Sequence, residues 1–583
     1  MTASAAPLAA RPAAGRPRPR WILPQAVDES AVAALVDALK LPPIICRLLV
    51  ARGQVAPEDA KRYLRPRLEQ LHEPSAMLDL DRAVERLAAA VRNREPVMVH
   101  GDYDVDGMCS TTILTRTIRD LGGVAIPFIP HRVTDGYDLS MAGVRATIEA
   151  GAKVVVTCDC GTSAREPVGA LCRAGIDVIV SDHHLPGGAL PDCLAVLNPK
   201  RDGCEYPDKN LAAVGIAFKL ALALTRALGR SDAPVMAMLD LVALATIADI
   251  APLRGENRVM VRYGLRMLAE TRNVGLRALI RAAGLDGKPL TAGRVGFILA
   301  PRLNAVGRLG HALRGVQLLL AETEGEANGI ARELEELNRE RQEIDKATLA
   351  QARQQLAAID LDRTYGLVLA SDEWHPGVIG IVASRIVEET GRPAVLVAVD
   401  EKGVGKGSGR SIPAFDLHAA LAACREHLVR FGGHRSAAGI TIDRARLGDF
   451  TRAFNDAAMA RLTREDLVPE LRVDVEIPLA DASEELEAML RHFEPFGIGN
   501  ATPMLVSRGV RVASRPRTLK GEGLRVSLEQ DGARLEALGW GLAGLAPLLA
   551  EGAMVDVAYR LERDDYKGEQ TLQARLADIV VRR

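Results

Sequence analysis

The stretch Val97-Met-Val-His-Gly-Asp-Tyr-Asp-Val-Asp-Gly107 decides the fold, because a short apolar run leads directly into three alternating aspartates and a glycine. A short apolar run that ends in turn residues is typical of a buried strand. In open α/β sheets, ligands bind outside the carboxyl ends of the strands. The stretch therefore predicts a buried strand whose carboxyl end carries an acidic, ligand-binding loop.

Short β-rich runs alternate with helical segments after this stretch. The expected elements are the strands 124–129, 153–157 and 177–180 and the helices 109–121, 142–150 and 164–173. Such alternation predicts a parallel sheet covered by helices on both faces. Because the carboxyl ends of parallel strands share one edge of the sheet, Thr157-Cys-Asp-Cys-Gly161 and Ser181-Asp-His-His184 should lie beside the first acidic loop.

The acids and imidazoles at this edge predict a metal site. Several carboxylates placed together repel one another unless cations lie between them. Mixed carboxylate and imidazole donors favour Mn²⁺ or Mg²⁺, whereas the cysteine spacing of a structural zinc site is missing. Asp249 ends an otherwise apolar helix and is costly to bury unless it is also a ligand.

Two alternatives bear on this site. The run from Asp102 to Gly107 could form a calcium loop, but it lacks the later glutamate of that pattern and follows a strand instead of a helix. Successive residues of an extended chain face opposite sides, so Asp182, His183 and His184 cannot all point the same way. At least one of these histidines should therefore support another ligand or contact substrate.

Composition limits the classes of protein to consider. The 583 residues include 74 basic and 75 acidic side chains, a net charge of −1, so a polyanionic partner must be held by a local patch. Hydrophobic residues make up 48% and charged residues 26%, which excludes a disordered, collagen-like or coiled-coil chain. This length favours roughly four domains.

Cysteine spacing and hydropathy favour a cytoplasmic protein without a membrane partner. The eight cysteines form no C-x-x-C pair, as expected for reduced thiols. The most apolar window, residues 233–253, carries two aspartates and two prolines, which favours a buried helix over a membrane span. The Arg- and Pro-rich N-terminal run has no apolar segment after it, so we expect no signal peptide.

Six segments follow one another along the chain. They are a disordered basic tail (1–28), a helical lead-in (29–75), the parallel-sheet domain (76–311), a solvated connecting helix (312–360), a smaller α/β domain (361–465) and a β-barrel (466–583). Turn signals between short β-rich runs favour about five strands in the barrel. No heptad pattern is present, so we expect a monomer.

The motifs as a set resemble the DHH phosphoesterase superfamily, named for the Asp-His-His found here at 182–184. Gly432-Gly-His-Arg-Ser-Ala-Ala-Gly439 resembles the signature of the associated DHHA1 domain. With Pro301-Arg-Leu-Asn-Ala-Val-Gly-Arg-Leu309 and Glu494-Pro-Phe-Gly-Ile-Gly-Asn500, the whole is similar to the RecJ family of bacterial exonucleases. The resemblance implies DHH, DHHA1 and OB-fold domains. It also implies 5′→3′ degradation of single-stranded DNA to mononucleotides in repair and recombination, with a helicase or single-strand-binding protein as a family-expected partner.

The resemblance also implies roles for single residues. Two Mn²⁺ or Mg²⁺ ions would be held by five ligands, namely Asp104, Asp106, Asp159, His183 and Asp249. Asp159 would bridge the ions, and His184 would orient the scissile phosphate or share in ligation. His100 and Asp102 are further possible ligands. Cys160 stands where the family commonly has Asn, which bears on hydrogen bonding around the site more than on the metals.

Substrate contacts are expected in three places. Near the junction of the two α/β domains, and in a Gly-rich loop, the candidates are Arg302, Asn304, Arg308, His375, Ser408, Arg410, Ser411, Gly432, Gly433 and His434. The arginines and serines of these two groups, with Asn304, would hold the 5′-terminal and scissile phosphates across an interdomain cleft, and His434 would lie beside the leaving nucleotide. A solvated arginine surface is the alternative. On the barrel a basic strip is expected, made of Arg511, Arg515, Arg517, Lys520 and Arg525. Tyr559, Tyr566 and Trp540 could stack on bases, although a place in the core is favoured for Trp540.

Metal-dependent phosphodiester hydrolysis is the reaction that these residues favour. Two ions can activate a water without a separate general base, and the sequence has no recognisable nucleophilic triad or phosphate-binding P-loop. One rival is another DHH enzyme, such as an oligonucleotide or cyclic-dinucleotide phosphodiesterase or a pyrophosphatase, but the extra barrel favours a polymer. Another rival is a non-catalytic replication scaffold of the same fold, which should lose metal ligands, and here every ligand position is filled.

Overall fold

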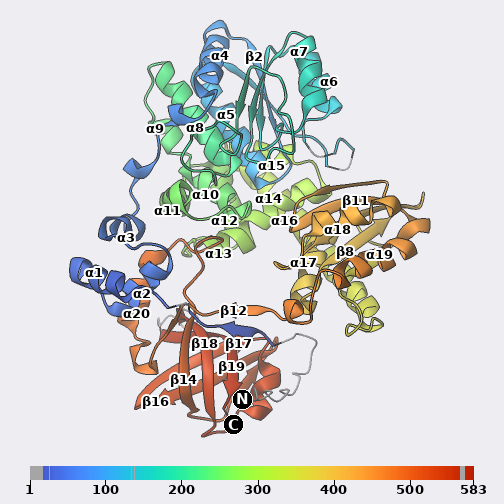
Figure 1. Cartoon of the computed structure of the whole chain (residues 1–583). Coiled ribbons are helices and arrows are strands. Elements are labelled where there is room, and N and C mark those ends of the chain that lie inside the picture. Colours follow the sequence, from blue (N-terminus) through green and yellow to red (C-terminus); the bar gives the residue numbers. More distant parts are fainter. Residues whose placement is uncertain (1–17, 25, 133, 137, 565–570, 583) are drawn as a thin grey trace. The chain divides into compact units, whose positions relative to one another are not determined.

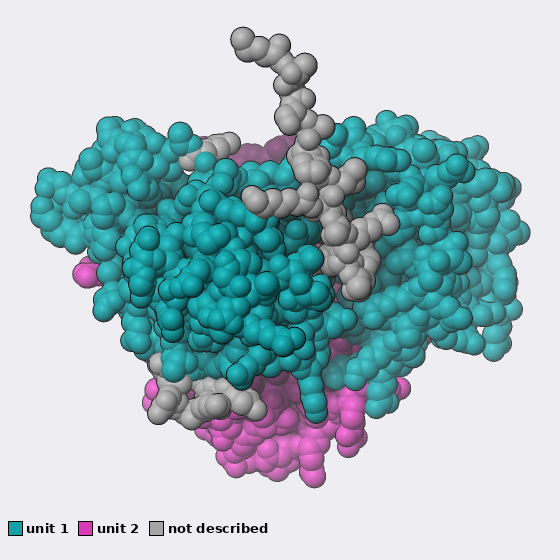
Figure 2. All heavy atoms as spheres, turned by 90° about the horizontal axis from the view of Figure 1, so that it is seen from below, with its two compact units in different colours: residues 1–63, 342–492, 502–583 teal, residues 64–341, 493–501 magenta. Residues whose placement is uncertain are grey.

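The computed structural model describes residues 18–24, 26–132, 134–136, 138–564 and 571–582. The chain forms two compact units, coloured separately in Figure 2. We refer to the magenta unit, which the key of Figure 2 numbers unit 2, as the first unit; it comprises residues 64–341 and 493–501. The second comprises residues 1–63, 342–492 and 502–583.

A five-stranded sheet organises the first unit, with strand order β3-β2-β4-β5-β6 and every neighbouring pair parallel. Its strands are β2 (Pro96–Gly101), β3 (Val124–Phe128), β4 (Val154–Cys158), β5 (Asp177–Ser181) and β6 (Ala195–Leu197). The predicted parallel sheet is confirmed, and β6 is a strand that the sequence did not reveal. Because β2 lies between β3 and β4, the chain changes direction across the sheet there, and the carboxyl ends of β2 and β4 form the topological switch point.

Helices cover both faces of this sheet (Figure 1). On one side they are α4 (Leu80–Asn93), α5 (Val105–Asp120), α8 (Ala213–Ala227) and α10 (Leu239–Ala248), and on the other α6 (Met141–Glu149) and α7 (Arg165–Arg173). Along β2, Val97 and Val99 belong to the first of these cores and Met98 to the second. Burial on both faces explains why the strands are apolar throughout instead of alternating.

The predicted solvated helix 312–360 is wrong in two respects. The segment forms two helices, α15 (Leu313–Leu320) and α16 (Glu324–Ala357). Ala327, Ile330 and Leu334 of α16 are buried in the core of the first unit. The high density of charged residues hid an apolar stripe at helical spacing, which packing requires and which overall composition does not show.

A mixed sheet of order β10-β11-β9-β8-β7 lies in the second unit. Its strands are β7 (Leu367–Ser371), β8 (Ala394–Val399), β9 (Val404–Arg410), β10 (Arg430–Gly433) and β11 (Ala437–Asp443), with the helices α17 (Ile379–Thr390), α18 (Leu417–Ala423) and α19 (Leu447–Met459). The predicted Gly-rich loop is instead the strand β9. A Cβ on Gly405, Gly407 or Gly409 would lie 2.4 to 2.9 Å from packed side chains. These glycines therefore allow close packing on one face of β9 and do not form a loop.

The C-terminal segment closes into a barrel. Strand β14 (Leu505–Val512) pairs with both β18 (Met554–Asp564) and β16 (Gly523–Gln530), and the ring is completed by β17 (Ala533–Trp540) and β19 (Thr571–Val581). Five strands thus form a closed ring, as predicted. Their order and the parallel pairing of β17 with β19 are those of an OB-fold. A short extra strand, β15 (Arg517–Leu519), pairs with β16.

The predicted disordered tail is wrong for its final residues, while residues 1–17 lie outside the described part of the chain. Strand β1 (Arg20–Ile22) pairs with β12 (Glu470–Arg472), and Trp21 Nε1 donates to Asp578 Oδ2 at 2.8 Å. Asp28 then caps helix α1 (Glu29–Leu39) by accepting from Ser30 N at 2.9 Å. An aromatic anchor and a sheet edge order this segment, and neither is evident from its Arg and Pro content.

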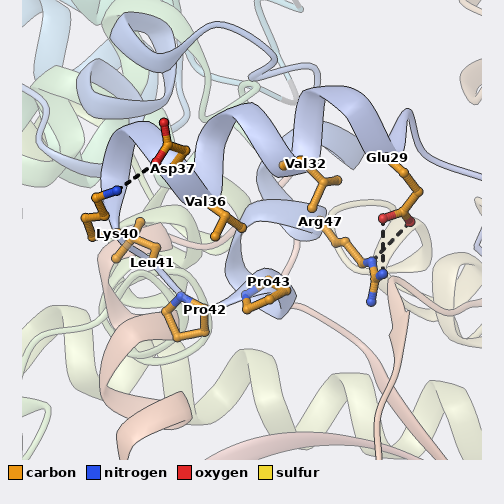
Figure 3. A pocket seen from close by; sticks show the side chains of 10 residues that line it. Glu29, Val32, Val36, Asp37, Lys40, Leu41, Pro42, Pro43 and Arg47 are labelled. Atoms are coloured by element: carbon orange, nitrogen blue, oxygen red, sulfur yellow. Dashed lines mark hydrogen bonds and ion pairs between the residues drawn. The ribbon is translucent and has the colours of Figure 1, made fainter.

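The helical lead-in is confirmed, with α1 followed by α2 (Pro43–Ala51) and α3 (Pro57–Leu64). A shallow groove of about 760 Å³ runs between α1 and α2 past Val32, Val36, Pro42 and Pro43 (Figure 3). Ion pairs between Glu29 and Arg47 and between Asp37 and Lys40 lie beside it. Among the helices that the structure describes, none is both long and apolar enough to span a membrane.

A buried ion pair holds the helices under the first sheet together. Lys219 Nζ lies 2.5 Å from Glu256 Oε1 and 2.5 Å from the carbonyl oxygen of His72. Tyr206 donates to the other Glu256 oxygen at 2.6 Å. Each of the two charged side chains is only 1% exposed. Because neither charge is hydrated, the pair is stable only when both members are present.

We expect Lys219→Ala to lower the free energy of unfolding by about 3–5 kcal/mol, because it leaves the Glu256 carboxylate buried and unpaired. Arg226 on the same helix is 45% exposed in its pairs with Asp232 and Glu73, so Arg226→Ala should cost less than about 1 kcal/mol. Urea unfolding followed by circular dichroism measures both. Equal losses in the two variants would contradict the prediction.

Candidate metal centre

The carboxyl end of β2 places three aspartates in a tight loop. Asp104 caps α5 by accepting from Gly107 N at 3.0 Å. Both oxygens of Asp106 accept from the first turn of α8, from Ala213 N and Val214 N, each at 2.8 Å. Helix N-termini stabilise carboxylates through unpaired N–H groups and the helix dipole. A Cβ on Gly107 would lie 2.4 Å from Asp102 O, so the tightness of the loop requires glycine there.

The carboxyl end of β4 holds Asp159 in a strained conformation. Its φ angle is +67°, in the left-handed region that side chains other than glycine rarely adopt. The Asp159 N–H donates to Ser181 O at 3.0 Å, and the residue is only 2% exposed. Such backbone strain persists where the surrounding structure enforces it, commonly at functional sites.

At the carboxyl end of β5, Asp182 orients the two histidines that follow it. Its Oδ1 accepts from His183 N at 2.7 Å and lies 2.7 Å from His184 Nδ1, while Oδ2 accepts from Thr162 N at 3.0 Å. The loop after β6 binds the backbone of the same histidines: Asn198 Nδ2 donates to His184 O at 2.8 Å and Lys200 Nζ to His183 O at 2.5 Å. Asp182 thus orients both histidines through hydrogen bonds, and both imidazoles lie among the possible metal ligands.

Seven predicted residues meet at this edge of the sheet. Their ligand atoms form three overlapping groups, each within 4.8 Å, which are Asp159–His183–His184, Asp106–His183–Asp249 and Asp102–Asp104–Asp159. Asp159 and His183 each belong to two groups. We call these seven residues the metal centre. His100 belongs to none of the groups: its Nδ1 lies 3.7 Å from Cys160 Sγ, and a Cβ on Gly143 would lie 2.7 Å from its Nε2.

Burial and charge repulsion both favour the protonated form of the carboxyls in the metal centre when no cation is bound. Burial, followed by the neighbouring carboxylates, raises the pKa of Asp102, Asp106, Asp159 and Asp249. Burial and the charge of His184 lower the pKa of His183 to about 3, so its imidazole is neutral, as a metal ligand must be. Burial opposes the imidazolium form of His184, but Asp182 outweighs it and raises the pKa of His184 to about 9.

Buried oxygen and nitrogen atoms without hydrogen-bond partners show that the site fits a divalent cation. Asp102 Oδ1, Asp159 Oδ1 and His183 Nε2 are buried and make no hydrogen bond among the described residues. Asp159 Oδ1 and His183 Nε2 lie 3.1 Å apart. Leaving buried polar atoms unsatisfied costs free energy that a cation bound between them would remove. Oxygen and imidazole donors suit Mn²⁺ or Mg²⁺, and burial raises the pKa of the Cys160 thiol, which disfavours a thiolate ligand.

The predicted substrate residues of the first unit are engaged within the fold. Arg302 pairs with Glu335 at 2.5 and 3.2 Å and is only 12% exposed, so its guanidinium stabilises the packing of α14 (Ala300–Leu309) on α16. Asn304 Oδ1 accepts from Val105 N at 3.2 Å and so holds the start of α5. Both residues belong to the motif 301–309 and were predicted to contact phosphate, but in the fold they bind Glu335 and the backbone of Val105.

Two arginines lie beside Tyr103, between the first two aspartates of the metal centre. Arg132 Cζ lies 4.6 Å from the centroid of the Tyr103 ring. Burial raises the pKa of Tyr103 to about 12, although the charges of Arg132 and Arg308 oppose the shift. Arg308 was predicted as a substrate contact and Arg132 was not. No sequence signal identified Arg132, because only the folded loop after β3 brings it over Tyr103.

The remaining predicted phosphate contacts belong to the second unit. Ser408 and Arg410 lie on one face of β9, where Arg410 Nη1 donates to Ser408 Oγ at 2.9 Å. Ser411 Oγ donates to Phe415 O at 2.9 Å, which closes a turn. Gly432 and Gly433 lie in β10 and His434 directly follows it, while His375 Nδ1 accepts from Gly377 N at 3.1 Å. Because β11 pairs with both β9 and β10, the residues on these strands belong to one part of the sheet, whereas His375 lies between β7 and α17.

The barrel confirms part of the basic strip as an exposed surface. Arg515, Arg517, Lys520 and Arg525 are exposed, and Arg517 lies directly opposite Arg525 across the β15–β16 pair. Arg511 is also exposed but pairs with Glu529. Like charges directly opposite one another destabilise a sheet, so this pair needs an anionic partner or solvent between its members.

Two predictions for barrel aromatics are wrong. Tyr559 is fully buried and lies 2.9 Å from Ser507 Oγ, so it is not available for base stacking. Trp540, which was expected in the core, is 46% exposed, because it ends β17 opposite Gly523, which has no side chain to cover the ring. Arg575 Cζ lies 5.8 Å from the ring centroid. Tyr566 lies outside the described residues.

Comparison with known proteins agrees with these features. The models described as the DHH family N-terminal domain, the DHHA1 domain and the RecJ OB domain match residues 96–246, 363–460 and 473–578. The single-stranded-DNA-specific exonuclease RecJ of Bacillus subtilis strain 168 is 35% identical over 96% of this chain and 71% of the relative. The chain belongs to the RecJ family. The RecJ protein of Thermus thermophilus is 37% identical over 92% of this chain and 79% of its own length.

Solved RecJ structures share the whole fold. The crystal structure of Thermus thermophilus RecJ in complex with Mn²⁺ has a TM-score of 0.83 and 33% identity, covering 97% of this chain and 80% of that one. The complex of the same protein with Mg²⁺ has a TM-score of 0.78 and 31% identity, covering 96% of this chain and 78% of that one. The resemblance to RecJ and the predicted three-domain fold are confirmed.

We expect Mn²⁺ to stabilise the protein more as the pH rises. The metal-free folded state keeps protons on carboxyls with raised pKa values that the unfolded chain has already lost. Its stability therefore falls as the pH rises above about 4, and a bound cation, which displaces these protons, removes the loss. Thermal unfolding with Mn²⁺ and with EDTA at about pH 5.5 and pH 7.5 measures the effect. A Tm difference that is the same at both pH values would contradict it, and Asp159→Asn should remove most of the difference.

Proposed function

We propose that the chain is a single-stranded-DNA-specific exonuclease that degrades its substrate from the 5′ end to mononucleotides. The reaction is hydrolysis of phosphodiester bonds with two divalent cations, Mn²⁺ or Mg²⁺, in DNA repair and recombination. The observation that carries the proposal is the metal centre, where seven carboxylate and imidazole side chains with unsatisfied buried donor atoms meet at a sheet edge of a RecJ-family chain. Because the substrate is DNA, the cytoplasm is the expected location.

Residues of the metal centre have distinct proposed roles. Asp104, Asp106, Asp159, His183 and Asp249 would hold the ions, and Asp159 would bridge them because it belongs to two groups of ligand atoms. Asp102 would join the ligand set, because its carboxylate lies in one of the groups of ligand atoms, whereas the His100 ring lies beside Cys160 and Gly143. When bound, such ions lower the pKa of a water and neutralise charge on phosphoryl oxygens. Asp182 positions both histidines, and the His184 imidazolium would place a positive charge beside the scissile phosphate.

Phosphates away from the reacting bond need other cations. Arg132 and Arg308 both place positive charge near Tyr103, in the loop between Asp102 and Asp104, so both suit contacts to the substrate backbone. In the second unit, Ser408, Arg410 and His434 would bind the 5′-terminal phosphate through charge-assisted hydrogen bonds. Arg302, Asn304 and Ser411 keep the structural contacts described above and would act through the shape of the site.

The barrel favours a polymeric substrate. Its exposed basic strip lies beside the exposed ring of Trp540, since Gly523 pairs with both Trp540 and Leu519. A row of cations next to an aromatic ring is the surface that binds single strands through backbone charge and base stacking. An oligonucleotide or cyclic-dinucleotide phosphodiesterase has no need of this surface, and a non-catalytic scaffold has no need of a complete metal centre. Association with a helicase or single-strand-binding protein, and the monomeric state, stay predictions.

We expect the purified protein with Mn²⁺ to release mononucleotides from 5′-labelled single-stranded DNA and to leave duplex DNA intact. Asp159→Ala should lower the rate by about 100-fold or more, because it removes charge stabilisation shared by both ions. Glu166→Gln, on the exposed side of α7, is the matched control and should keep full activity. A series of progressively shorter labelled strands, in place of early release of a labelled mononucleotide, would indicate digestion from the 3′ end and exclude the proposed polarity. Full activity of Asp159→Ala would exclude the site.

Single-strand binding should depend on the basic strip. Replacing Arg517 and Arg525 by Ala should weaken binding of a fluorescent oligodeoxynucleotide and reduce the slope of log Kd against log salt by about 1.4, near 0.7 for each lost phosphate contact. Arg534→Ala, on the same barrel but paired with Glu529, is the control and should leave the slope unchanged. Anisotropy titrations in EDTA at several salt concentrations measure this. An unchanged slope in the double variant would show that the strip does not contact DNA.

A further inference from the structure

A carboxylate from outside the predicted motifs contacts the turn that carries Asp159. Asp138 lies in the loop between β3 and α6, and its Oδ1 accepts from Gly161 N at 2.7 Å and from Leu139 N at 2.8 Å. The first bond crosses to the turn after β4, more than twenty residues away in sequence. Asp138 is thus joined to the turn that carries Asp159, although it belongs to none of the ligand groups.

This turn is one that the chain does not adopt easily. Asp159 has a φ of +67° and Gly161 a φ of +108°, so two left-handed residues flank Cys160. Two outside carboxylates hold its N–H groups: Asp138 accepts from Gly161 and Asp182 accepts from Thr162. Thr157 Oγ1 holds the Cys160 carbonyl at 2.7 Å. The conformation of Asp159 therefore depends on acceptors that lie outside the turn.

The backbone conformation of Asp138 is unfavourable for a residue with a side chain, which indicates that a contact of this side chain stabilises the loop. Its own φ is +75°, a conformation that favours glycine, and an acid there meets the repulsion of Asp182. Aspartate tolerates left-handed geometry better than most residues, but glycine would adopt it without strain. An aspartate at this position is unfavourable by itself, and its bond to Gly161 offsets that cost.

We propose that Asp138 is a positioning residue that holds the Asp159 turn in the geometry required for metal binding. The inference rests on the proposed role of Asp159 as a metal ligand. Asp138 would act through the hydrogen bond to Gly161 N, as groups around a metal site orient its ligands. The alternative is a local turn residue, for which the bond to Leu139 N is sufficient.

Two substitutions separate these roles. Asp138→Gly removes the acceptor and relieves the backbone strain, so a local turn residue should tolerate it. Asp138→Asn keeps an oxygen that can accept from both N–H groups and also tolerates a positive φ. We expect Asp138→Gly to weaken Mn²⁺ binding by about 10-fold or more, the usual effect of losing such a support, and Asp138→Asn to stay within about threefold of the unchanged protein.

Mn²⁺ binding to the full chain should be measured directly, by isothermal titration and by the electron paramagnetic resonance signal of free Mn²⁺. Asp135→Ala is the matched control, because Asp135 lies in the same loop and, among the described residues, accepts from His131 N at 2.9 Å and Thr134 Oγ1 at 3.1 Å, both within that loop. Thermal unfolding in EDTA tests folding: Asp138→Gly should keep its Tm within a few degrees.

The outcomes distinguish failure of this inference from failure of the metal site. If Asp159→Ala binds Mn²⁺ as the unchanged protein does, the proposed ligand role is wrong. If Asp159→Ala loses Mn²⁺ binding but Asp138→Gly keeps it, the metal site stands and the positioning role is wrong. Equal weakening in Asp138→Asn and Asp138→Gly would also overturn the proposal, because it would assign the effect to the charge instead of the hydrogen bond.

Discussion

Repulsion among buried carboxylates is the constraint on which the rest of the structure depends. Asp102, Asp104, Asp106, Asp159 and Asp249 converge at one sheet edge, which is unfavourable without compensation. The fold supplies part of that compensation with two helix N-termini, since α5 is capped by Asp104 and α8 by Asp106. Divalent cations supply the remainder, so the same repulsion that weakens the metal-free protein provides its affinity for metal.

Support for the metal centre comes mostly from residues that bind no metal. Asp182 fixes both histidines, and Asn198 and Lys200 hold the carbonyl groups of the same two residues. Asp138 holds the turn of Asp159 from another loop. The contacts of Asn198, Lys200 and Asp138 each join loops that follow different strands. A site assembled in this way is rigid because its loops stabilise one another, which is what precise placement of two ions requires.

Much of the fold could be predicted because its signals are local. Apolar runs such as Val97-Met-Val and the turn residues after them indicated β2, β4 and β5, and the sheet rule then placed their aspartates together. The predictions were wrong where packing against distant segments determines the structure. The Gly-rich segment 405–409 is a strand because its glycines meet packed side chains, and residues 20–22 are ordered by an anchor at Asp578. In both cases the contacting side chains lie outside the segment itself, so its own sequence does not reveal them.

The sequence by itself determined the chemistry: the residue types, their spacing on successive strands and hence a hard-metal site for phosphodiester hydrolysis. Only the tertiary structure decided which members reach the centre. In the fold, the carboxylate of Asp102 lies among the ligand atoms, whereas the His100 ring lies beside Cys160. Arg302 forms an ion pair with Glu335, and the Trp540 ring is exposed. The physical reason is that a strand pattern specifies which residues lie at a sheet edge, whereas the direction of each side chain depends on contacts with segments far away along the chain.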